Sequence, residues 1–151
     1  MDPDTLQKAK NRSLNFLSFR PRSIHETRHF LLLKRYSQEI IDEILAFLIE
    51  TGFLDDLKFA AWWVDSRCRA NPGGPIKLKM ELTQKGISPE IINRVTKLDY
   101  VNLAKAAAKK FAAKLTETDT QIRLRKLQDY LKRRGFTWDQ ITASLHLIRF
   151  N

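Results

Sequence analysis

The sequence contains few of the residues that cross-link, bend or interrupt a chain. Of its 151 residues, one is cysteine, five are glycine and five are proline. The single Cys68 excludes an internal disulfide and is typical of a reducing compartment, so we expect a cytoplasmic protein held together by apolar packing. No apolar run approaches the roughly 18 residues of a membrane span, and the amino terminus lacks the basic and apolar regions of a signal peptide. We therefore expect neither membrane association nor export.

Acidic residues are also in the minority. The chain has 27 lysine and arginine residues against 17 aspartate and glutamate residues, which gives a formal net charge of +10. Residues 101–151 hold 11 basic and 4 acidic residues, a net charge of +7 for that third of the chain. Such an excess favours polyanionic or acidic partners.

The dominant pattern in the sequence is helical periodicity. In residues 56–70 the side chains of Phe59, Ala60, Trp63 and Val64 recur at the spacing of one helix face, so we expect Trp63 in the core and Trp62 on its flank. Hydroxyl or acidic residues before such runs predict helix starts. The expected helices cover residues 4–19, 24–34, 38–51, 56–70, 75–85, 89–98, 100–116, 120–134 and 138–149.

An internal repeat organises these helices. The sequence Ser-Gln-Glu-Ile-Ile at 37–41 aligns with Ser-Pro-Glu-Ile-Ile at 88–92 and with Thr-Trp-Asp-Gln-Ile at 137–141, at offsets of 51 and 49. Residues 76–82 alternate like a strand, but their counterpart in the third copy follows the helical period. The sequence therefore predicts an all-α protein of three tandem three-helix, helix-turn-helix-like repeats at 1–54, 55–98 and 99–151, in an elongated, curved array.

Three short motifs resemble one bacterial family. Gly-Phe-Leu-Asp-Asp stands at 52–56, Arg-Pro-Arg-Ser at 20–23 and Tyr-Ser-Gln-Glu-Ile-Ile at 36–41, and the first motif continues with Phe59, Ala60, Trp63, Val64 and Arg67. Together they resemble the regulatory protein RecX, a modulator of the recombinase RecA. The resemblance implies inhibition or modulation of RecA ATPase, recombinase and coprotease activity, by lodging in the helical groove of the RecA filament and contacting its DNA.

One motif matches a metal site. His25, Glu26 and His29 fit H-E-x-x-H, in which two histidines one helical turn apart bind zinc and the glutamate activates water. A zinc metallopeptidase is therefore an alternative function. The other repeats carry Ile76 and Met80, and then arginine and aspartate, where the histidines stand, so we expect no metal, no cofactor and no enzymatic activity.

The expected partner-binding residues are cations on the solvent faces of helices, with one tryptophan on a helix flank. They are Arg67, Arg69, Lys77, Lys79, Lys85, Arg123, Lys126, Lys132, Arg133, Arg134 and Trp62. Sequence-specific reading of a major groove is disfavoured, because the helices that would enter the groove, at 38–50 and 89–97, carry carboxylates. We expect a monomer that binds the RecA filament and weakly contacts single- or double-stranded DNA without sequence preference. The alternative is a basic DNA-binding module without RecA specificity.

Overall fold

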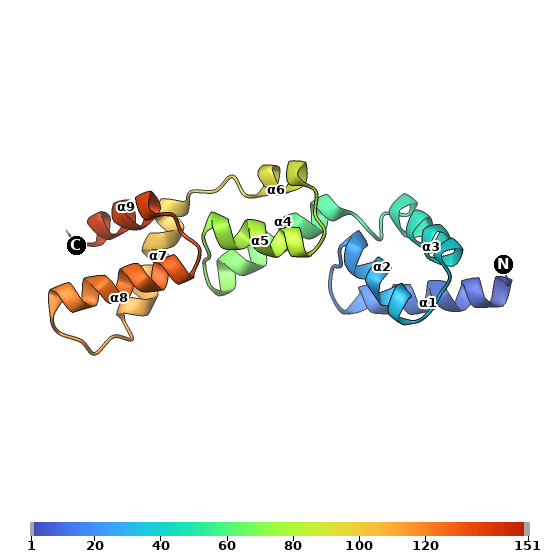
Figure 1. The fold of residues 1–151 in the computed structure, drawn as a ribbon, viewed down its shortest axis with the longest axis horizontal. Coiled ribbons are helices and arrows are strands. Elements are labelled where there is room, and N and C mark those ends of the chain that lie inside the picture. Colours follow the sequence, from blue (N-terminus) through green and yellow to red (C-terminus); the bar gives the residue numbers. More distant parts are fainter. Residues whose placement is uncertain (1, 150–151) are drawn as a thin grey trace. The chain divides into compact units, whose positions relative to one another are not determined.

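The structure is a computed structural model that describes residues 2–149, and these residues form nine α-helices without a strand (Figure 1). The helices are α1 (Pro3–Phe19), α2 (Ile24–Leu33), α3 (Gln38–Glu50), α4 (Asp56–Ala70), α5 (Pro75–Gln84), α6 (Pro89–Val95), α7 (Tyr100–Ala112), α8 (Thr120–Arg133) and α9 (Trp138–Arg149). The all-helical prediction is confirmed, including a helix over the alternating segment 76–82. Within the described residues, no helix combines the length and apolarity needed to cross a lipid bilayer.

Side-chain caps fix the starts of the third helix in each repeat. The Ser37 hydroxyl accepts the Ile40 N–H at 3.3 Å, and the Ser88 hydroxyl accepts the next repeat's corresponding N–H at 3.4 Å. In the third copy the caps are reciprocal, because Thr137 accepts from the Gln140 N–H while the Gln140 side chain accepts from the Thr137 N–H. The repeated hydroxyl residue is therefore a helix cap in each copy, as its position predicts.

The described chain divides into two compact units. One contains the residues up to 62 together with 82–92, and the other contains residues 63–81 together with those from 93 onward. The division runs through α4, α5 and α6, so it does not follow the three repeats; the repeat boundaries at 54 and 98 stay a prediction.

Each unit has its own apolar core. In the first, α1, α2 and α3 bury Ala9, Leu31, Ile41, Ile44 and Leu48 completely. In the second, small residues of α7 meet larger ones of α8, of α9 and of the turn between these two helices. They are Ala104, Ala107, Ala108, Leu131, Phe136, Ile141 and Leu145. Leu31 and Leu131, and likewise Ile41 and Ile141, occupy equivalent repeat positions, so the repeat predicts the core.

The face of α4 that was predicted to be buried is confirmed for three of its four residues. Phe59, Ala60 and Val64 are buried, as their spacing predicts. Trp63 is only half-buried, like Trp62, and the Arg67 guanidinium lies over its ring, 4.6 Å from the centroid. The expected contrast between a core Trp63 and a flanking Trp62 was therefore wrong.

Each unit also contains a joint between the middle helices of two successive repeats. In the first unit the Ser23 hydroxyl, just before α2, donates to the Lys85 carbonyl after α5 at 2.8 Å. In the second unit the Gly74 N–H, just before α5, donates to the Arg134 carbonyl after α8 at 2.8 Å. The offsets of 51 and 49 align Ser23 with Gly74 and Lys85 with Arg134. The two joints therefore connect equivalent positions of successive repeats.

A glycine follows the accepting carbonyl in both joints. Gly86 has φ +76° and Gly135 has φ +90°, a backbone region that side chains disfavour. A Cβ on Gly86 would lie 2.4 Å from the His25 Cβ, and one on Gly135 would lie 2.6 Å from the Lys77 Cβ. In the first repeat Arg35 takes this position with φ +65°, and its side chain is exposed. The glycines are therefore required by close packing as well as by backbone conformation.

Candidate partner-binding surfaces

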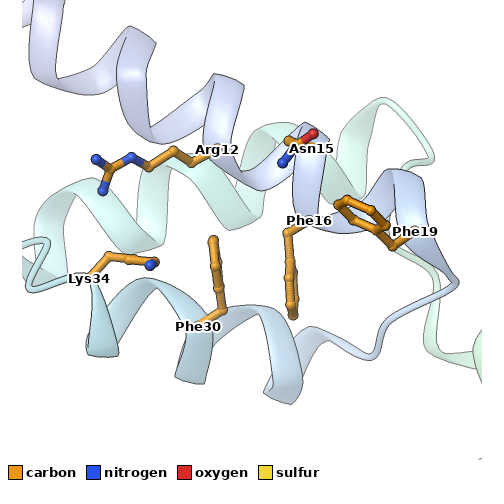
Figure 2. Close-up of a pocket in the computed structure, with 6 residues that line it drawn as sticks. All are labelled: Arg12, Asn15, Phe16, Phe19, Phe30 and Lys34. Carbon is orange, nitrogen blue, oxygen red and sulfur yellow. The ribbon is translucent and has the colours of Figure 1, made fainter.

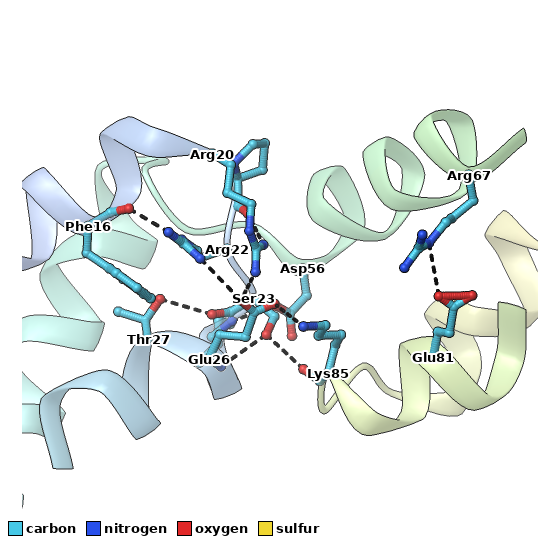
Figure 3. Close-up of polar contacts among 12 residues, drawn as sticks. Phe16, Arg20, Arg22, Ser23, Glu26, Thr27, Asp56, Arg67, Glu81 and Lys85 are labelled. Carbon is cyan, nitrogen blue, oxygen red and sulfur yellow. Dashed lines mark hydrogen bonds and ion pairs between the residues drawn. The ribbon is translucent and has the colours of Figure 1, made fainter. Parts of the chain in front are cut away.

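The first joint encloses a cluster of ionic side chains (Figure 3). The Glu26 carboxylate, 13% exposed, lies 2.7 Å from Arg20, 3.9 Å from Arg22 and 3.6 Å from Lys85. Arg20 and Arg22 belong to the Arg-Pro-Arg-Ser motif, whose serine makes the Lys85 hydrogen bond. This motif therefore holds two repeats together, and Lys85, expected to face a partner, has its ammonium directed at Glu26.

The same cluster surrounds the glutamate of the H-E-x-x-H motif. A metallopeptidase needs its glutamate free to take a proton from a metal-bound water. The Glu26 carboxylate faces three cations instead, and His25 packs against Gly86 of the joint. Among the described residues, no group of three histidine, cysteine or acidic side chains is arranged to hold a metal ion. The contacts of Glu26 give this motif a structural role.

The two aspartates of the Gly-Phe-Leu-Asp-Asp motif have different partners. Asp55 caps its own helix, since its side chain accepts the N–H groups of Leu57 at 3.0 Å and Lys58 at 3.2 Å. Asp56 instead accepts the Ile24 N–H at the start of α2, at 2.9 Å. Burial raises the pKa of Asp56 above its ordinary value; the Ile24 N–H acts against this rise, and repulsion from neighbouring carboxylates adds to it.

This raised pKa predicts a pH dependence of stability. Because the folded state favours protonated Asp56, the stability that protonation supplies is lost as pH rises from the ordinary pKa of aspartate through the raised one. Asp56→Asn keeps an oxygen acceptor for Ile24 but cannot ionise. We therefore expect the stability of the variant relative to the wild type to increase across that acidic interval and to stay constant above it.

Urea unfolding at a series of pH values measures this difference. Asp129→Asn makes the same chemical change at an exposed position of α8, away from the joint, and is the matched control. A difference between Asp56→Asn and wild type that is the same at every pH would contradict the raised pKa.

At least half of the ten cations expected to bind a partner make contacts within the protein, Lys85 among them. Arg67 pairs with Glu81 at 3.0 Å (Figure 3), and Arg69 pairs with Asp65 at 2.9 Å. Arg123 donates to the Glu117 carbonyl at 2.9 Å. Arg134 donates to the carbonyls of residues 71 and 72, which ties the loop before α5 to the end of α8. These side chains order helices and loops, so any partner must compete with the contacts they make.

The cations of α8 form the clearest basic surface. Lys126, Lys132 and Arg133 are exposed, and so is Arg125, which the sequence analysis did not select. They share the outer face of the helix with one acid, Asp129. Among the described side chains, none of the four cations has an ion-pair partner. This α8 basic face can approach an anionic partner without breaking an internal contact.

Of the three remaining residues expected to bind a partner, two are half-buried and one is exposed. Lys77 is half-buried beneath Gly135, whereas Lys79 is exposed on α5. Trp62 is half-buried, with its ring tilted against Phe59 at 6.0 Å between centroids, and it lines a cavity of about 370 Å³ with Arg22 and Phe53. The structure therefore places Trp62 at a surface hollow.

An apolar groove of about 740 Å³ lies in the second unit, between the start of α5 and the α8–α9 turn. Trp138 is 61% exposed and Ile76 is 59% exposed, and Phe136 and Ile141 form the deeper wall. Lys132 of the α8 basic face stands on its rim. Sequence reasoning missed this site, although Trp138 stands where the other repeats carry Gln38 and Pro89, and a tryptophan at a polar repeat position is the signal that could have revealed it.

A second cavity, of about 390 Å³, lies on the first unit between α1 and α2 (Figure 2). Arg12, Asn15, Phe16 and Phe19 line it from one face of α1, and Phe30 and Lys34 line it from α2. The rings of Phe16 and Phe30 are stacked, 4.1 Å apart and 5° from parallel. Sequence reasoning missed this cavity as well. It selected cations on the expected solvent faces of helices and did not consider exposed phenylalanines.

Three family models match the chain in succession. They describe the first, second and third three-helix domains of RecX and cover residues 9–48, 55–95 and 99–145. The chain belongs to the RecX family. The predicted tandem of three-helix units is thereby confirmed as the RecX domain arrangement.

Relatives agree with this assignment. A regulatory protein RecX from Pelodictyon phaeoclathratiforme is 38% identical over 90% of this chain and 86% of its own length. The regulatory protein RecX of Bacillus subtilis is 32% identical over 97% of this chain but only 57% of its own length. The crystal structure of RecX from Lactobacillus salivarius covers 98% of this chain and 99% of its own with a TM-score of 0.86, and its 24% identity makes it evidence for the fold. The RecX relatives are named as regulatory proteins.

Proposed function

We propose that this RecX-family protein binds the RecA filament on DNA and lowers its ATPase, recombinase and coprotease activities. The observation that carries the proposal is the succession of all three RecX domains along one chain, with 38% identity to a named regulatory protein. The Glu26 contacts favour a binding role over peptidase chemistry.

The groove around Trp138 is the part of this chain best suited to contact a protein partner. Exposed tryptophan in an apolar hollow is typical of the residues that dominate binding energy at protein interfaces. The α8 side of the groove supplies Lys132 and one acid, Asp129, and the α8 basic face, with four cations, continues from it along the same helix. A partner with an apolar anchor and acidic neighbours therefore fits this surface in both shape and charge.

Trp138→Ala tests the role of the groove. Because truncating a central tryptophan often removes about 2 kcal/mol or more of binding free energy, we expect the concentration for half-inhibition of RecA to rise roughly 30-fold. The assay is RecA ATPase on single-stranded DNA, followed by strand exchange, with increasing amounts of each variant. The wild type should lower both rates below those of RecA alone.

Leu147→Ala is the matched control, because Leu147 is an exposed apolar residue of the same helix that does not line the groove. It should inhibit like the wild type. Equal inhibition by Trp138→Ala and wild type would move the contact away from the groove. If folded wild-type protein in excess leaves both RecA rates unchanged, the RecA proposal itself is wrong.

A sequence-tolerant DNA-binding module is the second candidate, and the α8 basic face favours it. Four exposed cations on one helix face can follow a phosphate backbone, with an affinity that falls steeply as salt increases. This function requires no RecA, so DNA binding without an effect on RecA activity would select it.

A further inference from the structure

Four side chains of the first unit form a continuous column. The Arg22 guanidinium lies 4.0 Å from the centroid of the Phe16 ring, Phe16 stacks on Phe30 at 4.1 Å, and the Lys34 ammonium lies 5.6 Å from the centroid of Phe30. Because Phe30 covers one face of Phe16 and Arg22 the other, Phe16 has no open face. The outer face of Phe30, away from Phe16, is turned toward the Lys34 ammonium (Figure 2).

A second aromatic ring stands open beside this column. Phe19, at the last position of α1, is 76% exposed, although a phenylalanine gains stability only when it is buried. Arg12 and Asn15 project from the same face of α1, at intervals of seven and four residues before Phe19. Among the side chains that line the cavity, two are cations and none is acidic. The cavity therefore combines flat apolar surfaces with positive charge.

We propose that this cavity binds unpaired bases of single-stranded DNA. One base stacks on the outer face of Phe30, where it replaces the Lys34 ammonium, and a further base of the strand stacks on Phe19, on the other side of the Phe16–Phe30 pair (Figure 2). Arg12 and the displaced Lys34 contact the phosphates. Bases of any sequence present a flat ring, so such a site is tolerant of sequence. The Asn15 amide, which both donates and accepts hydrogen bonds, can meet the edge of a base.

The chemistry of the cavity favours a single strand over a duplex. In a duplex the flat faces of the bases are covered by their neighbours, and a ring on the protein surface cannot reach them. The cavity volume of about 390 Å³ falls within the roughly 300–1,000 Å³ of ligand sites and suits the base on Phe30. The base on Phe19 can extend beyond the cavity, because that ring is 76% exposed. This site lies on α1 and α2, so it is distinct from the α8 basic face, and its proposal does not depend on RecA.

The test is binding of a fluorescently labelled oligothymidylate, measured by anisotropy at several salt concentrations. Loss of one stacking platform in Phe19→Ala should weaken single-strand affinity roughly 5- to 100-fold. The slope of log K against log salt should not change, because no phosphate contact is lost. Lys34→Gln should reduce that slope by about 0.7, the value for one phosphate contact on a single strand. Affinity for a duplex should be nearly the same in Phe19→Ala and wild type.

Two variants serve as matched controls. Leu33→Ala removes an exposed apolar side chain next to Lys34, and Phe53→Ala removes an exposed phenylalanine of the same unit; neither residue lines the cavity. Both should bind the oligonucleotide like the wild type. Circular dichroism establishes that each variant is folded.

The proposal is overturned if Phe19→Ala and Phe30→Leu both keep wild-type affinity for the single strand, or if Leu33→Ala loses as much affinity as Phe19→Ala. It is also overturned if Phe19→Ala inhibits RecA less well while binding the oligonucleotide normally, since the cavity would then hold a protein segment. Failure of wild-type protein to affect RecA would leave the oligonucleotide result unchanged, so the two proposals fail separately.

Discussion

Gly135→Ala is expected to lower the free energy of unfolding of the second unit by about 2–4 kcal/mol. About 1 kcal/mol of this comes from placing a Cβ at φ +90°. The rest comes from overlap, because the new Cβ would lie 2.6 Å from the Lys77 Cβ and 2.7 Å from the Lys77 backbone nitrogen. A backbone atom inside α5 cannot move alone, so the joint must open and weaken the Ile76 N–H bond to the Gly135 carbonyl.

Gly52→Ala separates the two contributions. Gly52 also has positive φ, +82°, but a Cβ there would meet nothing within 4 Å. Its replacement should therefore lower stability by only about 1 kcal/mol. Chemical denaturation followed by circular dichroism measures both variants. Equal losses for Gly52→Ala and Gly135→Ala would show that close packing at the joint contributes nothing.

The helices and the two cores were predictable from local patterns. Helical period, capping hydroxyls and the offsets of 51 and 49 each depend on residues close in sequence or on comparison between copies. They place Leu31 and Leu131 in the cores, and they assign α5 as a helix although its own alternation resembles a strand. These three signals agree at such positions, which is why the fold could be predicted.

The binding surface was harder to predict because exposure and ion pairing depend on tertiary contacts. Lys126 lies on α8 and Arg134 directly follows this helix, and the two cations look alike in the sequence. Only folding brings the loop carbonyls of residues 71 and 72 to Arg134, while Lys126 remains exposed. Whether a cation can bind a partner therefore depends on which groups lie next to it in the folded protein. The sequence alone identifies the cations but does not show which of them stay accessible.

The Asp-Asp pair shows the same limit within one motif. A carboxylate before a helix predicts an N-terminal cap, and Asp55 confirms it. Asp56 accepts from Ile24, 32 residues earlier in the chain. Nothing local distinguishes the two residues, because their difference arises where α4 meets the start of α2.

Phe59→Ala is expected to have the largest effect of any single replacement proposed for this protein, a loss of about 3–5 kcal/mol in the stability of the first unit. Phe59 is 1% exposed and is among the largest fully buried side chains of the described chain. Truncation removes a ring from water-free surroundings and leaves a cavity that the rigid helices cannot close. Since small domains are stable by only about 5–15 kcal/mol, the variant should be partly unfolded at moderate temperature.

Phe53→Ala makes the same chemical change six residues away, at a side chain that is 57% exposed. Because most of that ring is already in water, its loss should stay within about 1 kcal/mol. Urea unfolding of both variants can be followed by tryptophan fluorescence, since the Trp62 ring lies 6.0 Å from that of Phe59. Equal losses in the two variants would mean that α4 does not present the Phe59, Ala60 and Val64 face to the core, and the helix phase derived from the spacing of these residues would have to be abandoned.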